Sequence, residues 1–76
     1  MRRFYFHFAN GHTTLDDVGV DLPDIAAVRK EALGTTRDLL FEAPSRFWEG
    51  EPCRLWVTDE PNAAGQTILS VELAAM

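Results

Sequence analysis

Three short segments of this chain of 76 residues alternate apolar with polar side chains, and this pattern limits the possible folds most strongly. Phenylalanine occupies every second position from Phe4 to Phe8, and a similar alternation returns in residues 53–58 and 68–73. A period of two places successive side chains on opposite faces of an extended strand. The sequence therefore predicts three half-buried strands at these positions.

The segments between these strands carry turn signals. Asn10 and Gly11 predict a hairpin turn after the first strand, because both residues tolerate positive φ. A brief return strand is expected at residues 13–15, followed by an acidic, turn-rich connection at residues 16–21. Residues 59–65 contain proline, asparagine and glycine and predict the turn between the last two strands.

One amphipathic helix is predicted in the middle of the chain. Asp24 can cap its first turn, Pro44 closes it, and residues 45–52 are expected to form a loop. At about 100° per residue, one apolar stripe gathers Ile25, Val28, Ala32, Thr36, Leu39 and Ala43. An interior glycine costs about 1 kcal/mol relative to alanine. A kink at Gly34, or two short helices joined there, is therefore an open alternative.

The predicted order is strand, strand, helix, strand, strand, within a single small domain of residues 1–76. Its simplest arrangement is an α+β two-layer sandwich, in which the helix covers one face of a four-stranded, mainly antiparallel sheet. The expected core consists of Phe4, Phe6, Phe8, Ile25, Val28, Ala32, Leu39, Leu55, Val57, Leu69, Val71 and Leu73.

The sheet face away from the helix is the most distinctive predicted surface, since one helix cannot cover both faces. This face is expected to present Arg3, Tyr5, His7, Arg54, Trp56, Thr58, Ile68 and Ser70. Tyrosine and tryptophan are typical anchors of protein interfaces. We expect an interaction face made of Tyr5, His7, Arg54, Trp56 and Ile68. Scattered surface aromatics, or cover from Phe47 and Trp48, are the alternatives.

The charge balance bears on the partner. The chain has 7 Lys and Arg against 12 Asp and Glu, a net charge of −5, which disfavours nucleic acid and anionic membranes as partners. We expect a small non-enzymatic interaction or regulatory module that binds itself as a homodimer or binds an unidentified protein. Stacking of the aromatic faces is the simplest form of such a dimer, and pairing of edge strands is the rival geometry. The alternative function is a nucleic-acid-associated factor that stacks bases on the same aromatic face.

No pattern of residues indicates catalysis, a cofactor or a metal. Cys53 is expected on an inward strand face, where a thiol behaves as a small hydrophobe. His7 and His12 flank the first turn, but the three or four converging ligands of a zinc site are missing, so both are expected to be solvated. The aspartates of residues 16–24 lack the spacing of a calcium loop. We therefore expect no enzyme, no cofactor and no bound metal.

The sequence also bears on location. Arg2 and Arg3 precede an aromatic run that stops at Asn10, too soon for an export signal. The longest apolar runs are far shorter than the ~20 residues of a membrane helix. The single cysteine excludes a disulfide scaffold. We expect a cytoplasmic protein with a reduced thiol.

A set of short motifs recurs in a known family. The motifs are Phe4-Tyr5-Phe6, Asn10-Gly11, Asp16-Asp17, Gly19, Leu22-Pro23-Asp24, Arg29-Lys30-Glu31-Ala32, Leu55-Trp56-Val57, Asp59-Glu60 and Gly65. Together they resemble a family of short, uncharacterised proteins abundant in rhizobia and related alphaproteobacteria. The resemblance covers nearly the whole chain and implies a source and a fold, but no catalytic residue. The chain departs from the family pattern at residues 61–64, which lengthen the final hairpin, and at Gly34 in the helix.

Overall fold

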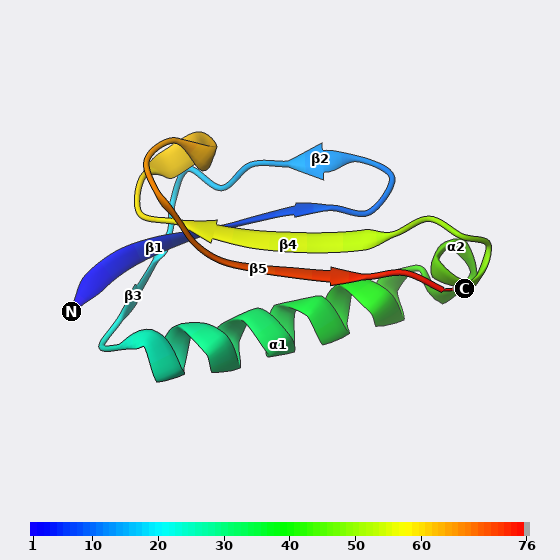
Figure 1. Cartoon of the computed structure of the whole chain (residues 1–76), viewed down its shortest axis with the longest axis horizontal. Helices are drawn as coiled ribbons and strands as arrows, with labels where there is room; N and C mark the ends of the chain where they lie inside the picture. The colour runs from blue at the N-terminus through cyan, green and yellow to red at the C-terminus, as the bar shows by residue number, and fades with distance from the viewer. Residues whose placement is uncertain (76) are drawn as a thin grey trace.

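The computed structural model describes residues 1–75 and shows an open antiparallel sheet with one long helix beneath it (Figure 1). Its elements are β1 (Arg2–Ala9), β2 (Thr13–Thr14), β3 (Val20–Leu22), α1 (Ile25–Glu42), α2 (Pro44–Trp48), β4 (Cys53–Thr58), the 3-10 turn η1 (Pro61–Ala63) and β5 (Thr67–Leu73). The predicted α+β class, the antiparallel pairing and the single main helix are confirmed, but the sheet has five strands rather than four.

The additional strand is β3, which lies where a turn-rich connection was expected. The strand order is β2-β1-β4-β5, and β3 pairs with the first half of β1 while β2 pairs with its end. Opposite Asp21 in this pairing lies Arg3, whose Nε and Nη2 donate hydrogen bonds of 3.1 and 3.0 Å to the Asp21 carboxylate. This two-point contact, with Val20 and Leu22 on either side, gives the acidic segment the register of a strand.

Helix α1 begins and ends close to the predicted positions. Asp24 caps it by accepting a hydrogen bond of 2.9 Å from the backbone N–H of Ala27. The helix continues through Gly34, so neither a kink nor two short helices form there. Pro44 starts α2 directly after α1, because proline fits the first turn of a helix. The prediction of a loop over residues 45–52 is therefore wrong for the part that forms α2.

The glycine inside α1 yields a stability prediction. A Cβ atom built on Gly34 has no neighbour within 4 Å, so Gly34→Ala should raise the free energy of unfolding by about 0.5–1 kcal/mol. Gly50 is the control, because its Cβ is equally free of neighbours but its φ is +103°. Gly50→Ala should destabilise by about 1–2 kcal/mol. Thermal melts measure both changes, and a lower Tm for Gly34→Ala would contradict this account of α1.

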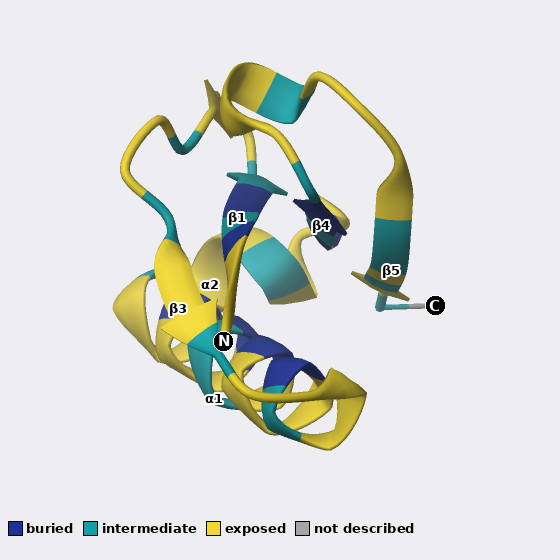
Figure 2. Cartoon of the chain, turned by 90° about the vertical axis from the view of Figure 1, so that its left-hand side faces the viewer, coloured by how far each residue is buried: buried dark blue, intermediate teal, exposed yellow. Residues whose placement is uncertain are grey.

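The core lies between α1 and the centre of the sheet. Its buried members are Phe4, Phe6, Val28, Ala32, Leu39, Cys53, Leu55 and Val57. Figure 2 shows α1 beneath β1 and β4, with β5 standing beyond the helix. As a result, Leu69 and Val71 are only half-buried and Leu73 is 40% exposed. The expectation that Leu73 and Ile25 belong to the core is wrong, since Ile25 is 43% exposed.

A register shift changes which face one side chain of β5 occupies. Val57 lies opposite Leu69 and Thr58 lies opposite Thr67, so Ile68 is an extra residue in the ladder. Such a bulge interrupts the alternation of side chains. Ile68, like its neighbour Leu69, packs against the core between the sheet and α1. Its predicted place on the opposite face of the sheet is therefore wrong.

Candidate functional site

The sheet face away from α1 is smaller than the sequence indicated, because part of it is covered. Tyr5 and Trp56 are half-buried, Arg54 is exposed, and His7 is fully buried with 0% exposure. The expectation of a solvated His7 on an open surface is thus wrong. Tyr5, Arg54 and Trp56 as contact residues stay a prediction.

Hydrogen bonds hold His7 at both ring nitrogens. The backbone N–H of Asp16 donates to Nδ1 at 2.9 Å, and Nε2 lies 2.7 Å from Oγ1 of Thr58. Since Nδ1 accepts, we assign the ring proton to Nε2, which donates to Thr58. The Thr58 hydroxyl in turn donates to the carbonyl of Glu60 at 2.7 Å. His7 is therefore a neutral structural histidine, with no free nitrogen for a ligand.

Asp16 organises the loop that covers His7. Its carboxylate accepts backbone N–H bonds from Phe6 at 3.1 Å, Val18 at 2.9 Å and Gly19 at 3.1 Å. The bonds to Val18 and Gly19 form a local turn that aspartate favours. The bond from Phe6 fills the gap in the β1 ladder between β3 and β2. The run Asp16-Asp17-Val18-Gly19 signals the local turn in the sequence, but nothing in it signals the bond to β1.

The loop between β4 and β5 completes this cover. The carbonyl of Asp16 accepts a hydrogen bond of 2.9 Å from the backbone N–H of Asn62 in η1. Figure 1 shows η1, in orange, beside the segment that leads from β2 to β3. Through this hydrogen bond, η1 holds the β2–β3 segment over the sheet.

The pKa values of His7 and Asp16 make stability depend on pH. Burial lowers the pKa of His7 below its usual 6.5, although the charge of Asp16 opposes this effect. Burial alone would raise the pKa of Asp16, but the N–H donors of Val18, Gly19 and Phe6 hold it below its usual 3.8. Both groups therefore bind fewer protons in the folded than in the unfolded chain.

The contribution of His7 to the free energy of unfolding should therefore be fully present above about pH 6.5. It should be lost as the pH decreases toward the folded-state pKa of His7. A second loss should follow below about pH 3.8, as Asp16 is protonated. Urea unfolding between pH 8 and pH 5 measures the first step. His7→Gln removes the titrating group, so the free energy of unfolding of this variant should change little between pH 8 and pH 5. An unchanged slope in that variant would contradict the assignment of a neutral buried His7.

The open part of this face centres on Trp56. The guanidinium carbon of Arg54 lies 4.6 Å from the centre of the Trp56 ring, and the His7 ring lies 5.4 Å from it. Across the ladder, Arg54 faces Glu72 and Trp56 faces Ser70. The cation and the aromatic ring therefore already contact each other, and an acidic residue lies opposite the cation.

The remaining candidate groups do not form a reactive site. Cys53 is buried, as predicted, and burial raises the pKa of its thiol, which disfavours the nucleophilic thiolate. His12 is exposed, as predicted. Within residues 1–75, no three His, Cys, Asp or Glu side chains lie close enough to hold a metal ion. No helix in this part of the chain is long and apolar enough to cross a membrane.

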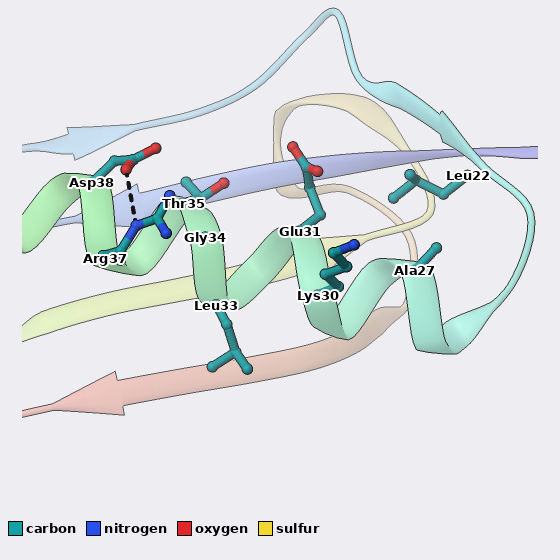
Figure 3. Close-up of a pocket in the computed structure, with 9 residues that line it drawn as sticks. All are labelled: Leu22, Ala27, Lys30, Glu31, Leu33, Gly34, Thr35, Arg37 and Asp38. Carbon is teal, nitrogen blue, oxygen red and sulfur yellow. Dashed lines mark hydrogen bonds and ion pairs between the residues drawn. The ribbon is translucent and has the colours of Figure 1, made fainter.

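A shallow hollow of about 730 Å³ lies along the outer side of α1 (Figure 3). Its lining consists of Leu22, Ala27, Lys30, Glu31, Leu33, Gly34, Thr35, Arg37 and Asp38. The Nε of Arg37 lies 3.4 Å from Oδ1 of Asp38, and both side chains are exposed. Ligand sites place a few polar groups inside an enclosed apolar cavity. Mixed, solvated charges do not build such a site, and this hollow is not a candidate.

The two edges of the sheet differ. One edge consists of the short strands β2 and β3, which pair with the two ends of β1, and the Asp16 carboxylate accepts the N–H of Phe6 between them. β5 pairs with β4 on one side only, and no described strand lies on its other side. The backbone groups that β5 directs away from β4 therefore meet no other strand of residues 1–75.

Comparison with known proteins identifies the family alone. Neither the curated proteins nor the solved structures provide a significant match to this chain. A family model described as a domain of unknown function matches residues 3–74. This match confirms the expected membership of a family without an assigned role. The chain belongs to the family Domain of unknown function (DUF6894).

Proposed function

We propose that this chain is a small non-enzymatic module that acts by binding protein, and that it does so through the open edge of β5. The observation that carries the proposal is the asymmetry of the sheet. One edge of the sheet consists of the short strands β2 and β3, with the carboxylate of Asp16 bound to β1 between them. The other edge is the continuous seven-residue strand β5, which meets no further strand of residues 1–75. An unpaired edge presents a row of backbone donors and acceptors to another strand.

The composition of β5 supports strand addition. Natural edge strands are commonly protected by lysine, proline, a short length or a bulge that twists the edge away. β5 has seven residues and contains neither proline nor a basic residue. Its one charge is Glu72, and its bulge at Ile68 lies near its start. The stretch after the bulge is therefore free to pair.

The side chains of β5 add an apolar contact to the backbone edge. Leu69, Val71 and Leu73 lie opposite Val57, Leu55 and Cys53 of β4 and share their face of the sheet. α1 leaves them half-buried or exposed. A strand added beside β5 would cover this apolar row on its open side.

The non-enzymatic part of the proposal rests on how the reactive groups are used. His7, Asp16 and Thr58 direct their polar atoms to one another and to backbone groups. No buried side-chain nitrogen or oxygen in residues 1–75 is left without a hydrogen-bond partner. Catalytic groups instead need a free atom directed at a substrate. These residues therefore support the fold.

Binding of nucleic acid is less well supported. Arg54 lies over the Trp56 ring on which a base would stack, and Glu72 faces Arg54 across the ladder. The net charge of −5 adds repulsion of phosphates. We therefore expect no binding of a single-stranded oligonucleotide in a fluorescence-anisotropy titration at low salt. Salt-sensitive binding that Trp56→Ala abolishes would favour this alternative.

Site-specific photo-cross-linking in living cells of the native host tests the proposal. A photoreactive residue replaces Ser70 on β5, Thr14 on the short edge strand β2, or Arg54 on the aromatic face, all of which are exposed. We expect cross-links to protein from position 70 and none from position 14. Cross-links from position 54 alone, equal cross-linking at positions 70 and 14, or no cross-links at all would overturn the proposal.

A further inference from the structure

We infer that the strand that completes the open edge belongs to a second copy of this chain, with β5 pairing antiparallel to the partner's β5 about a two-fold axis at Val71. This inference rests on the proposed function, since it names the partner at the same edge. A two-fold axis makes the contact self-complementary, as in most homodimers.

The sequence of β5 matches itself in this register. Val71 lies opposite the partner's Val71, and Leu69 lies opposite the partner's Leu73. Leu69, Val71 and Leu73, which lie on the α1 side of the sheet and are only partly covered by the helix, then lie opposite apolar side chains of the partner only. Directly opposed side chains of this kind are the main stabilising pairs of antiparallel sheets. On the other face, Ser70 lies opposite the partner's Glu72.

Charge selects among the possible registers. A two-fold axis at Glu72 would place two carboxylates directly opposite each other, which is destabilising. An axis at Ser70 would place Glu72 against the partner's Ile68 and Thr67 against the partner's Leu73. Only the axis at Val71 keeps the carboxylate opposite a hydroxyl and matches the whole apolar row.

The size of this side of the molecule suits a dimer. Figure 1 looks directly at this side, with β5 in front and α1 below it, and the view spans 38 by 21 Å. Each partner of a stable complex buries roughly 800 Å². A chain of this size can bury that much surface only if the dimer contact includes α1 as well as the edge of β5. Leu33 of α1 is 64% exposed, and in Figure 3 its side chain extends from the side of the helix where the β5 ribbon is drawn. We expect it to extend the contact.

Disulfide trapping tests the register. In a Cys53→Ala background, Val71→Cys places two thiols directly opposite each other, at the Cα separation of about 4.5–5.5 Å that a disulfide can span. Ser70→Cys and Glu72→Cys are the controls, because each lies about 7–8 Å from its own copy. We expect Val71→Cys to form covalent dimers roughly tenfold faster or more than either control. A mixture of the two controls should form heterodimers.

Sedimentation equilibrium of the unmodified chain keeps the inference testable if a cysteine variant does not fold. We expect a monomer–dimer equilibrium that Val71→Lys shifts to monomer. A wild-type chain that stays monomeric at millimolar concentration, or cross-linking without preference for position 71, would overturn the inference. Photo-cross-links from position 70 to a different protein would then leave the proposed function standing. Without those cross-links, both would fall.

Discussion

Asp16→Ala should destabilise the chain by about 2–4 kcal/mol, because one carboxylate satisfies three backbone N–H groups. Hydrogen bonds to charged acceptors contribute about 1.5–3 kcal/mol each, and less where the donor is exposed. The N–H of Phe6 is partly buried, and Val18 is exposed. Loss of the carboxylate leaves a gap in the β1 ladder and frees the turn that places the Asp16 backbone against His7. Urea unfolding at pH 7.5 measures the change.

Asp17→Ala is the matched control for this substitution. Asp17 is the next residue, has the same side chain and is exposed, and it forms no side-chain hydrogen bond in the part of the chain that the structure describes. We expect a change within about 0.5 kcal/mol. Equal losses for Asp16→Ala and Asp17→Ala would show that the carboxylate of Asp16 does not hold the β2–β3 segment in place.

Leu55→Ala should cause the second large loss of stability and leave a chain that barely folds. Leu55 has 0% exposure at the centre of the core. Leucine-to-alanine changes at such sites cost about 2–5 kcal/mol. At roughly 0.05–0.15 kcal/mol per residue, a chain of this length has only about 4–11 kcal/mol in total. A large fraction of the stability should therefore disappear in a urea or thermal melt.

Leu33→Ala provides the same chemical change at an exposed site of α1. We expect its effect on unfolding to stay within about 0.5 kcal/mol when the protein is dilute, so that association does not contribute. If Leu55→Ala were as mild as Leu33→Ala, the centre of the core would not lie between α1 and β4.

The regular elements were predictable because their periods are local properties of the sequence. The alternation in residues 3–8 and 53–58 predicted β1 and β4, and Asp24 predicted the start of α1. β3 was missed because its register depends on the contact between Arg3 and Asp21, which lie far apart in the chain. α2 was missed because Pro44 was interpreted as an end, although proline also begins helices.

The candidate site was less predictable than the fold. The alternation correctly placed His7 away from α1, but it carries no information about the loop that covers it. That cover depends on Asp16 and Asn62, whose partners lie in other elements. A bulge moved Ile68 to the other face, and no local signal marked it. The open edge follows from the strand order, which the sequence did not show.

Amide hydrogen exchange at increasing protein concentration tests the central claim, association through β5, most directly. The amides of β5 that point away from β4 should exchange fast in dilute protein. They should slow roughly tenfold or more toward millimolar concentration, as the partner strand pairs with them. Amides of β2 on the other edge provide the control and should change little. Exchange in β5 that is independent of concentration would contradict pairing between copies at this edge.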